Sequence, residues 1–193
     1  LQINSSGSIS RTGSGTSTVG DLLLSPAEGS SGVSFGIVAL NLIVAGTVPQ
    51  FNDTDFTLSS ANLEFQNSPT FGNGSSVDVS NGELILQSGA TISGSSLDFT
   101  SSIFKPSGTV SLTGSSDFTF GSDSSVMLEG DTTISDDMGS FSWPSLDLNG
   151  NTLTLASNIT DMSVEGAMSI GTGESFNSET SNLSLNSTLT IDD

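Results

Sequence analysis

Short apolar–polar–apolar stretches recur along this chain, separated by a few small polar residues. One clear copy is LDLNGNTLTLAS at 146–157, where the pairs Leu146/Leu148 and Leu153/Leu155 flank Asn-Gly-Asn. Alternation with a period of two residues is typical of strands with one buried face, and Asn-Gly is typical of a tight turn. The stretch therefore predicts two short β-strands joined by a corner.

The same pattern returns at a nearly constant interval. The first apolar residue of each copy falls at positions 35, 56, 77, 97, 118, 141, 162 and 183, so successive steps are 21, 21, 20, 21, 23, 21 and 21 residues. A third apolar element follows 12 to 16 residues into each unit, at Val48, Phe71, Ile92, Val110/Leu112, Ile134, Leu153/Leu155 and Phe176. Internal repetition at this length indicates a stacked repeat architecture.

Each unit of about 21 residues therefore predicts three strands, each pairing in parallel with its equivalent in the next unit. We predict an all-β, three-sided parallel β-helix (a β-solenoid) of about eight coils over residues 35–193. A β-sandwich is the alternative, although sandwich strands do not recur at a fixed phase with like residues in like places. Residues 1–34 fit the phase poorly and predict an irregular segment, either a cap or a contact between subunits.

The repeat also predicts which side chains stack inside the coil. The first strand would contribute one inward column of Phe35, Phe56, Val77, Leu97, Phe118, Phe141, Met162 and Leu183. Its second inward column would be Ile37, Leu58, Val79, Phe99, Phe120, Trp143, Val164 and Leu185. The second strand would contribute Leu42, Leu63, Leu84, Phe104, Val126, Leu146, Met168 and Leu189.

The charge balance narrows the choice of partners. The chain has 21 acidic residues against two basic ones, for a net charge of -19. Nucleic acids and anionic membrane surfaces are bound through clustered Lys and Arg, so neither is expected as a partner. The apolar run at 37–48 is too short to span a bilayer and contains Asn41, so we expect no membrane insertion. Cys and His are absent, which excludes disulfides and the usual soft metal ligands.

The outward residues of the first strand form a mixed column of Gly36, Thr57, Asp78, Asp98, Thr119, Ser142, Ser163 and Ser184. This column lacks the regular threonine array expected of an ice-binding solenoid. Asp78 and Asp98 would lie on adjacent coils, where they could share a calcium ion, the one cofactor that the pattern allows. Calcium requires several oxygen ligands, so a solvated acidic surface is the simpler interpretation.

Other outward positions suggest contacts and modification. Ile43, Ile85 and Met127 are apolar where the second strand faces outward, and they are candidates for a contact between subunits. Six Asn-x-Ser/Thr sequons predict positions for N-linked glycans: Asn4, Asn52, Asn73, Asn158, Asn182 and Asn186.

The repeats LDLNGNTLTLAS, VDVSNGELILQS and NSTLTIDD resemble those in the right-handed parallel β-helices of bacterial surface proteins. Autotransporter passenger domains and filamentous-haemagglutinin-like adhesins are examples of this group. The resemblance covers roughly residues 35–193, and it implies an extracellular, cell-surface protein with an elongated structural or adhesive role. It carries no functional residues to this chain, because no motif beyond the repeat matches.

The sequence shows no catalytic constellation, and we expect a protein that is not an enzyme. Strand-like pattern continues to both ends of the chain, which predicts end-to-end stacking with copies of itself or with the continuation of a longer chain. The first hypothesis is therefore a structural subunit of an extracellular filament or cell-surface assembly. The alternatives are a β-helical stalk segment of a larger surface adhesin and a carbohydrate-active β-helix that binds surface polysaccharide.

Overall fold

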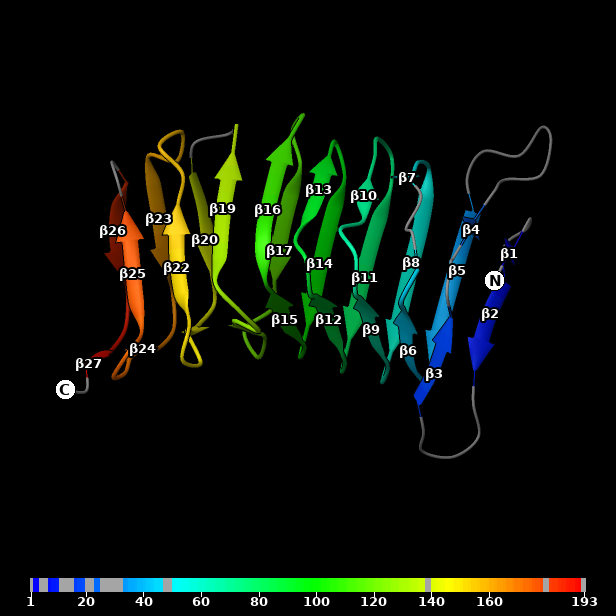
Figure 1. The fold of residues 1–193 in the computed structure, drawn as a ribbon, viewed down its shortest axis with the longest axis horizontal. Helices are drawn as coiled ribbons and strands as arrows, with labels where there is room; N and C mark the ends of the chain where they lie inside the picture. The colour runs from blue at the N-terminus through cyan, green and yellow to red at the C-terminus, as the bar shows by residue number, and fades with distance from the viewer. Residues whose placement is uncertain are drawn as a thin grey trace.

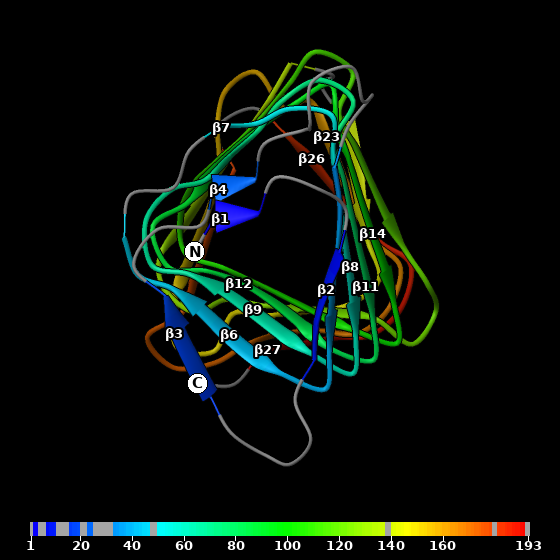
Figure 2. The same ribbon diagram turned by 90° about the vertical axis from the view of Figure 1, so that its right-hand side faces the viewer.

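The protein is described by a computed structural model covering residues 2–3, 7–10, 16–19, 23–24, 33–46, 50–137, 140–178 and 181–191. Every regular element in these ranges is a β-strand, and successive strands wind around a common axis (Figure 1). Seen along that axis, the strands lie on three sides of a closed outline (Figure 2). We call these sides face 1, face 2 and face 3, after the order in which each coil passes through them.

Face 1 contains β2 (Gly7–Ser10), β5 (Val33–Val38), β8 (Thr54–Ser59), β11 (Ser76–Ser80), β14 (Ser96–Thr100), β17 (Asp117–Phe120), β20 (Ser140–Trp143), β23 (Asp161–Val164) and β26 (Asn182–Leu185). Face 2 contains β3 (Thr16–Val19), β6 (Asn41–Val44), β9 (Asn62–Phe65), β12 (Glu83–Leu86), β15 (Ile103–Pro106), β18 (Ser125–Met127), β21 (Leu146–Asp147), β24 (Met168–Ile170) and β27 (Leu189–Ile191). Face 3 contains β7 (Gln50–Phe51), β10 (Thr70–Phe71), β13 (Ala90–Ser93), β16 (Gly108–Thr113), β19 (Thr132–Asp136), β22 (Thr152–Leu155) and β25 (Ser175–Ser178). A separate pair joins β1 (Gln2–Ile3) to β4 (Leu23–Leu24).

Every described strand pair is parallel, and each strand pairs with its equivalent one coil away. The prediction of a parallel β-solenoid with a repeat of about 21 residues is confirmed, with about seven turns where about eight were predicted. The β-sandwich alternative is wrong, because its strands would pair antiparallel. Among the first 34 residues, β2 pairs with β5 and β3 pairs with β6, so these two strands extend faces 1 and 2.

The predicted columns match the observed register except on face 1 between Phe118 and Phe141, where β17 and β20 are not paired and the predicted stack is interrupted. On face 1, Phe35 pairs with Phe56 and Val77 pairs with Leu97. The face 2 column is continuous from Leu42 to Leu189. Apolar alternation therefore set both the pairing and the side of the strand that faces the core, since a shift by one residue would turn every side chain to the other side.

Face 3 is less regular than the sequence pattern suggested. Phe71 pairs with Phe51 and Ile92, whereas Phe176 pairs with Leu153. The predicted element at Val48 lies outside the described residues. The apolar positions of face 3 therefore shift along the strand from coil to coil, while those of faces 1 and 2 do not.

Aromatic side chains fill the interior of the first complete coils. Phe56 is fully buried, and its ring contacts the rings of Phe35, Phe51 and Phe71 with centroids 6.1, 5.0 and 6.0 Å apart. These three contacts are edge-to-face, the arrangement that aromatic quadrupoles favour. Rings from faces 1 and 3 thus interlock across the axis of the coil.

Serine and threonine hydroxyls tie successive coils together at the corners. The buried Ser102 hydroxyl donates to the carbonyl oxygen of Val79 at 3.0 Å, and the Ser124 hydroxyl donates to that of Phe99 at 3.0 Å. Each of these bonds reaches back one coil, and the same hydroxyl oxygens accept from corner amides: the Gly82 amide donates to Ser102 Oγ at 3.3 Å, and the Ser102 amide donates to Ser124 Oγ at 3.4 Å. Buried backbone groups are costly without a partner, so these hydroxyls explain why small polar residues occupy corners inside the core.

The corner between faces 1 and 2 requires a left-handed backbone residue in four successive coils. Ala39, Ser60, Asn81 and Ser101 have φ values of 51°, 50°, 55° and 49°. Such a conformation is unfavourable for residues with a Cβ, and the repeated use of one geometry shows that stacking fixes this corner. Next to it, a Cβ on Gly82 would lie 2.0 Å from the carbonyl oxygen of Ala61, so only glycine fits there.

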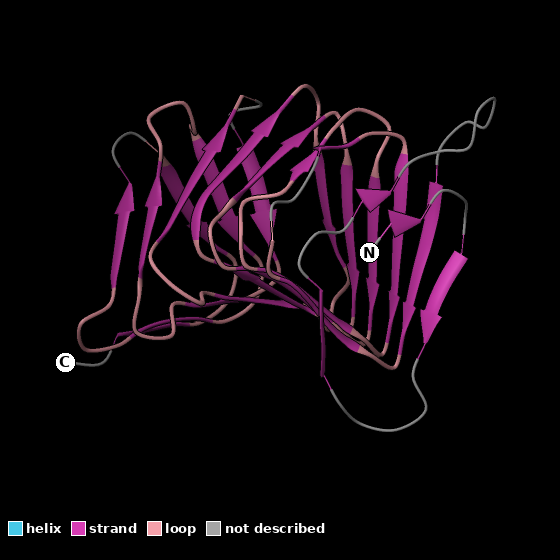
Figure 3. Ribbon diagram, turned by 45° about the vertical axis from the view of Figure 1, so that its right-hand side comes forward, coloured by secondary structure: helices cyan, strands magenta, loops and turns pink. Residues whose placement is uncertain are grey.

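Face 1 is interrupted once. Its strands form a six-stranded sheet from β2 to β17 and a three-stranded sheet from β20 to β26, and β17 is not paired with β20. The sheets of faces 2 and 3 continue past this point without a break, and Figure 3 shows that strands and loops alone make up the described coils. The interruption coincides with the 23-residue step, in which the corner between faces 1 and 2 at 121–124 is longer than the equivalent corners at 81–82 and 101–102. We call this interruption the seam.

Truncation of a central ring tests the packing of the columns. We expect Phe56→Ala to lower the free energy of unfolding by about 3–5 kcal/mol, because it leaves a cavity among three other rings. The neighbouring exposed residue provides the control, and Thr57→Ala should change the free energy by less than about 0.5 kcal/mol. Urea unfolding followed by circular dichroism measures both, and equal losses would contradict the assignment of inward and outward faces.

Candidate functional site

The acidic residues predicted to stack on face 1 do lie side by side. Asp78 on β11 pairs with Asp98 on β14, and the two carboxyl groups are hydrogen-bonded to each other. Desolvation raises the pKa of Asp78 above its ordinary value of 3.8, and the charges of Asp98 and Asp55 raise it further. Asp55 itself accepts a hydrogen bond of 2.8 Å from the Ser76 hydroxyl. The pair can thus share a proton on the outer surface of face 1.

The calcium prediction at Asp78 and Asp98 remains a prediction. Among the described residues, no group of three or more His, Cys, Asp and Glu side chains is arranged to hold a metal ion. Calcium prefers six to eight oxygen ligands, which two carboxylates on a flat strand face do not supply.

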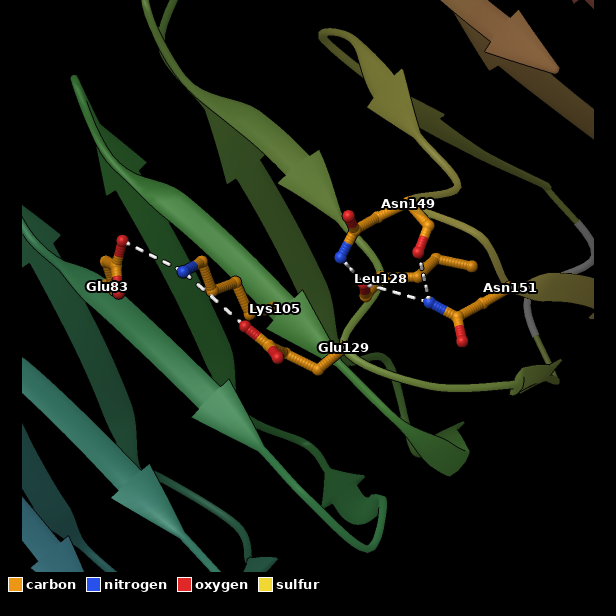
Figure 4. Close-up of polar contacts among 6 residues, drawn as sticks. All are labelled: Glu83, Lys105, Leu128, Glu129, Asn149 and Asn151. Atoms are coloured by element: carbon orange, nitrogen blue, oxygen red, sulfur yellow. Dashed lines mark hydrogen bonds and ion pairs between the residues drawn. The ribbon is translucent and has the colours of Figure 1, made fainter. Parts of the chain in front are cut away.

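A lysine lies between two glutamates on the outer side of face 2. The Lys105 ammonium on β15 is 3.1 Å from Glu83 Oε1 and 3.5 Å from Glu129 Oε1 (Figure 4). Burial lowers the pKa of Lys105, but hydrogen bonds and charges from Glu83 and then Glu129 outweigh it, so the pKa rises above 10.5. The lysine stays protonated and links three successive coils.

Amides and carboxylates also stabilise the corners between faces 2 and 3. Asn149 Nδ2 donates to the carbonyl oxygen of Leu128 at 3.0 Å, and Asn151 Nδ2 donates to the same oxygen at 3.3 Å (Figure 4). The turn predicted at Asn-Gly-Asn is therefore a corner whose side chains hold the preceding coil. Asp131 accepts from the backbone amide of Thr152 at 2.8 Å, so this acidic side chain has a structural role.

The three apolar outward residues of face 2 are half-buried. Ile43 and Ile85 flank Glu64 and line a hollow of about 120 Å³ with it. Met127 lines a separate hollow of about 310 Å³ beside Asp147, nearer the C-terminal coils. The structure thus places two of these candidates together and the third apart, and their role in a contact between subunits stays a prediction.

Five of the six predicted glycan positions are described, and all five are exposed: Asn52, Asn73, Asn158, Asn182 and Asn186. Asn4 lies outside the described residues. Three of the five use their amide nitrogen in the fold. Asn182 and Asn186 donate to carboxylates of Asp161 and Glu165 at 3.0 and 2.8 Å, and Asn158 donates to the Asp136 carbonyl oxygen. A glycan on these three would replace a bond between coils.

A groove lies at the seam. It has a volume of about 460 Å³ and is lined by Phe118, Thr119, Phe120, Gly121, Ser122, Ser142, Trp143, Pro144, Glu165 and Gly166. Glu165 is the one charged residue of this lining, and hydrogen bonds from Asn186, Ser163 and Ser142 hold its pKa below the ordinary 4.5. Sequence reasoning missed this groove, although the 23-residue step marked its position.

The geometry defines the class of protein: the chain is an all-β parallel β-solenoid. No protein-family model, no curated protein and no solved structure matches it. Within the described ranges, no helix has the length and hydrophobicity needed to span a bilayer.

The acidic pair predicts how stability depends on pH. Because the pKa of Asp78 is raised in the folded state, this carboxyl group binds more protons in the folded protein than in the unfolded chain above pH 3.8. Its contribution to the free energy of unfolding should therefore fall as pH rises from about 3.8 through its folded pKa, opposite in sign to the contributions of Asp161 and Glu165, whose pKa values are lowered. Asp78→Asn should remove this decline and stabilise the protein at pH 7, whereas Thr57→Asn in the same column should keep it. Urea midpoints from pH 3.5 to 7 measure the slope, and an unchanged slope in Asp78→Asn would refute the interpretation.

The lysine between two glutamates predicts a salt-dependent effect. Lys105→Met leaves Glu83 and Glu129 without their shared cation, and we expect a loss of about 1 kcal/mol at low ionic strength. The loss should shrink in 1 M NaCl, where charges are screened beyond about 3 Å. Lys105→Arg keeps the charge and serves as the control. Urea unfolding at both salt concentrations measures the difference, and a loss that does not depend on salt would mean that only packing of the lysine stem matters.

Proposed function

We propose that this chain is a structural rod of an extracellular filament or cell-surface assembly, and that rods extend end to end by stacking one coil on the next. The proposal assigns no chemical reaction to the protein. The extracellular location and the bacterial surface setting rest on the resemblance of its repeats to those of surface β-helices.

One observation carries the proposal: the last described coil leaves its inward side chains uncovered. Phe176, Leu183 and Leu185 are only half-buried, whereas their partners one coil earlier, such as Met162 and Val164, are 1% and 0% exposed. On β27, Leu189 is 41% exposed and Ile191 is 64% exposed. Full burial of one such side chain contributes about 1.5–3 kcal/mol.

A further parallel coil would cover this surface with the register already present. β26 and β27 are also edge strands of their sheets in the described structure, so their free backbone groups offer a template for another strand. A second copy of the chain that adds strands there makes a heterologous contact, and repetition of such a contact produces an open filament. The stalk alternative differs in one respect only, because the covering coil then belongs to the same polypeptide.

Self-assembly provides the test. Analytical ultracentrifugation of the purified chain should show particles far above 19.6 kDa whose size grows with protein concentration. Since each copy carries a net charge of -19, assembly should be stronger at 0.5 M NaCl than at 0.05 M NaCl. Electron microscopy of the large particles should show unbranched rods.

A pair of variants on one strand separates stacking from other association. Leu185→Glu places a charge on the uncovered inward side of β26 and should reduce the particles to monomers. Ser184→Glu places the same charge on the outward side and should leave assembly intact. A wild-type chain that stays monomeric at all concentrations would refute the filament and favour the stalk. Loss of assembly in both variants would mean that the contact lies on the outer surface instead.

A further inference from the structure

The seam breaks one face of the solenoid while leaving the coil intact. Face 1 is hydrogen-bonded on either side of the seam, and faces 2 and 3 run through it without a break. At the seam the inward rings of Phe118, Phe120 and Phe141 are half-buried, although the matching residues of earlier coils are fully buried. The seam therefore opens the apolar interior to the outer surface at one place along face 1.

Backbone groups of β17 face into the seam. In a parallel ladder, alternate residues bond to the strand on either side. The amide of Gly121 donates to the carbonyl of Phe99 at 2.7 Å, on the side of β14. The amide and carbonyl groups of Phe118 and Phe120 therefore point the other way, toward β20.

On the opposite wall of the groove, backbone groups of β20 also point into the seam. The amide of Glu165 donates to the carbonyl of Trp143 at 2.9 Å, so Trp143 bonds toward β23. The backbone groups of Ser142, one residue earlier, accordingly point toward β17. The groove thus has polar backbone groups along both of its edges.

Aromatic side chains lie between these polar edges. The rings of Phe118 and Phe120 lie nearly parallel, at an interplanar angle of 17° and a centroid distance of 6.1 Å. Ser142 and Glu165 add a hydroxyl and a carboxylate that are hydrogen-bonded to each other at 3.2 Å. A mostly apolar floor with a few convergent polar groups is typical of ligand sites, and the volume of about 460 Å³ suits a small molecule or one or two units of a polymer.

The charge of the protein and the width of the seam groove limit which ligand can bind there. A net charge of -19 and the ionised Glu165 in the wall oppose an anionic ligand. An inserted peptide strand would need about 9.6 Å between its two neighbours, twice the usual strand spacing. Some Cα atoms of β17 and β20 lie within 8 Å of each other, which is too close for an inserted strand but leaves room for hydroxyl groups.

A second hollow continues from the groove along face 1. It has a volume of about 300 Å³ and shares Ser142, with Ser163 and Ser184 following on the next coils. These hydroxyls repeat at the strand spacing of about 4.8 Å. The track extends the groove across two further strands of face 1, which favours a linear polymer over a single small molecule.

We propose that the seam groove binds a neutral polysaccharide chain, with one part lying over Phe118 and Phe120 between the backbone edges and the rest following the serine track. The hydroxyl groups of such a chain can both donate to Glu165 and the free carbonyls and accept from the free amides. This proposal does not depend on end-to-end stacking.

The single tryptophan of the chain lies in the groove wall and provides a direct signal. Because the protein has one Trp and no Tyr, its intrinsic fluorescence reports the surroundings of Trp143 alone. We expect at least one of dextran, galactomannan and mixed-linkage β-glucan to shift this emission and to retard the protein in native gels that contain the polymer. Alginate, which is anionic, should do neither.

A blocking variant and a matched control locate the site. Ser142→Phe fills the groove from its exposed rim and should weaken binding by more than about tenfold through a steric clash. Thr57→Phe introduces the same side chain in the same outward column, three coils before the groove-lining strand β17, and this variant should bind as the wild type does. Circular dichroism checks that both variants fold. If Ser142→Phe does not fold, Glu165→Gln takes its place, because it removes only the charge and should weaken binding.

The outcomes separate the alternatives. Retardation by a neutral polymer that Ser142→Phe abolishes and Thr57→Phe retains would support the proposal. Absence of retardation and of any emission shift with all three neutral polymers would overturn it. Binding to alginate alone, or binding that survives both Ser142→Phe and Glu165→Gln, would overturn it as well.

Discussion

The whole molecule depends on the register between one coil and the next. Side chains alternate along each strand, so a slip of one residue would expose the entire apolar set of a coil. The pairing of Phe35 with Phe56, and of Leu42 with Leu63, holds that register at two faces at once. Each coil therefore aligns the next, and a repeat of about 21 residues follows from geometry rather than from any single interaction.

The same constraint explains the composition. Three strands per coil require three corners, and corners interrupt the ladder where backbone groups still need partners. Hydroxyls such as that of Ser102 and amides such as that of Asn149 supply those partners from side chains. Some acids serve the same purpose from outside, as Asp131 does at Thr152. The net charge of -19 is thus partly a consequence of how corners are stabilised.

Both functional proposals concern places where no neighbouring strand covers the apolar interior. At the last described coil, inward residues such as Leu185 lack a following layer, and we infer that another coil stacks there. At the seam, the ladder of face 1 stops between β17 and β20, and we infer that a neutral polymer meets the open edges. The two sites use different sides of the coil, because the stacking proposal concerns inward side chains and the edge of β26, whereas the serine track lies on the outward side of face 1.

The sequence alone determined the strands, their register on faces 1 and 2 and the inward columns, because alternation and period are local properties that every coil repeats. It also placed Asp78 beside Asp98, since equal positions in adjacent coils must meet. It did not determine the ion pairs of Lys105 or the drift of face 3, which depend on how corners of unequal length set the strands. The seam was decided by tertiary structure for the same reason: the 23-residue step is visible in the chain, but only the folded coil shows that the corner at 121–124 is lengthened and that β17 is not paired with β20.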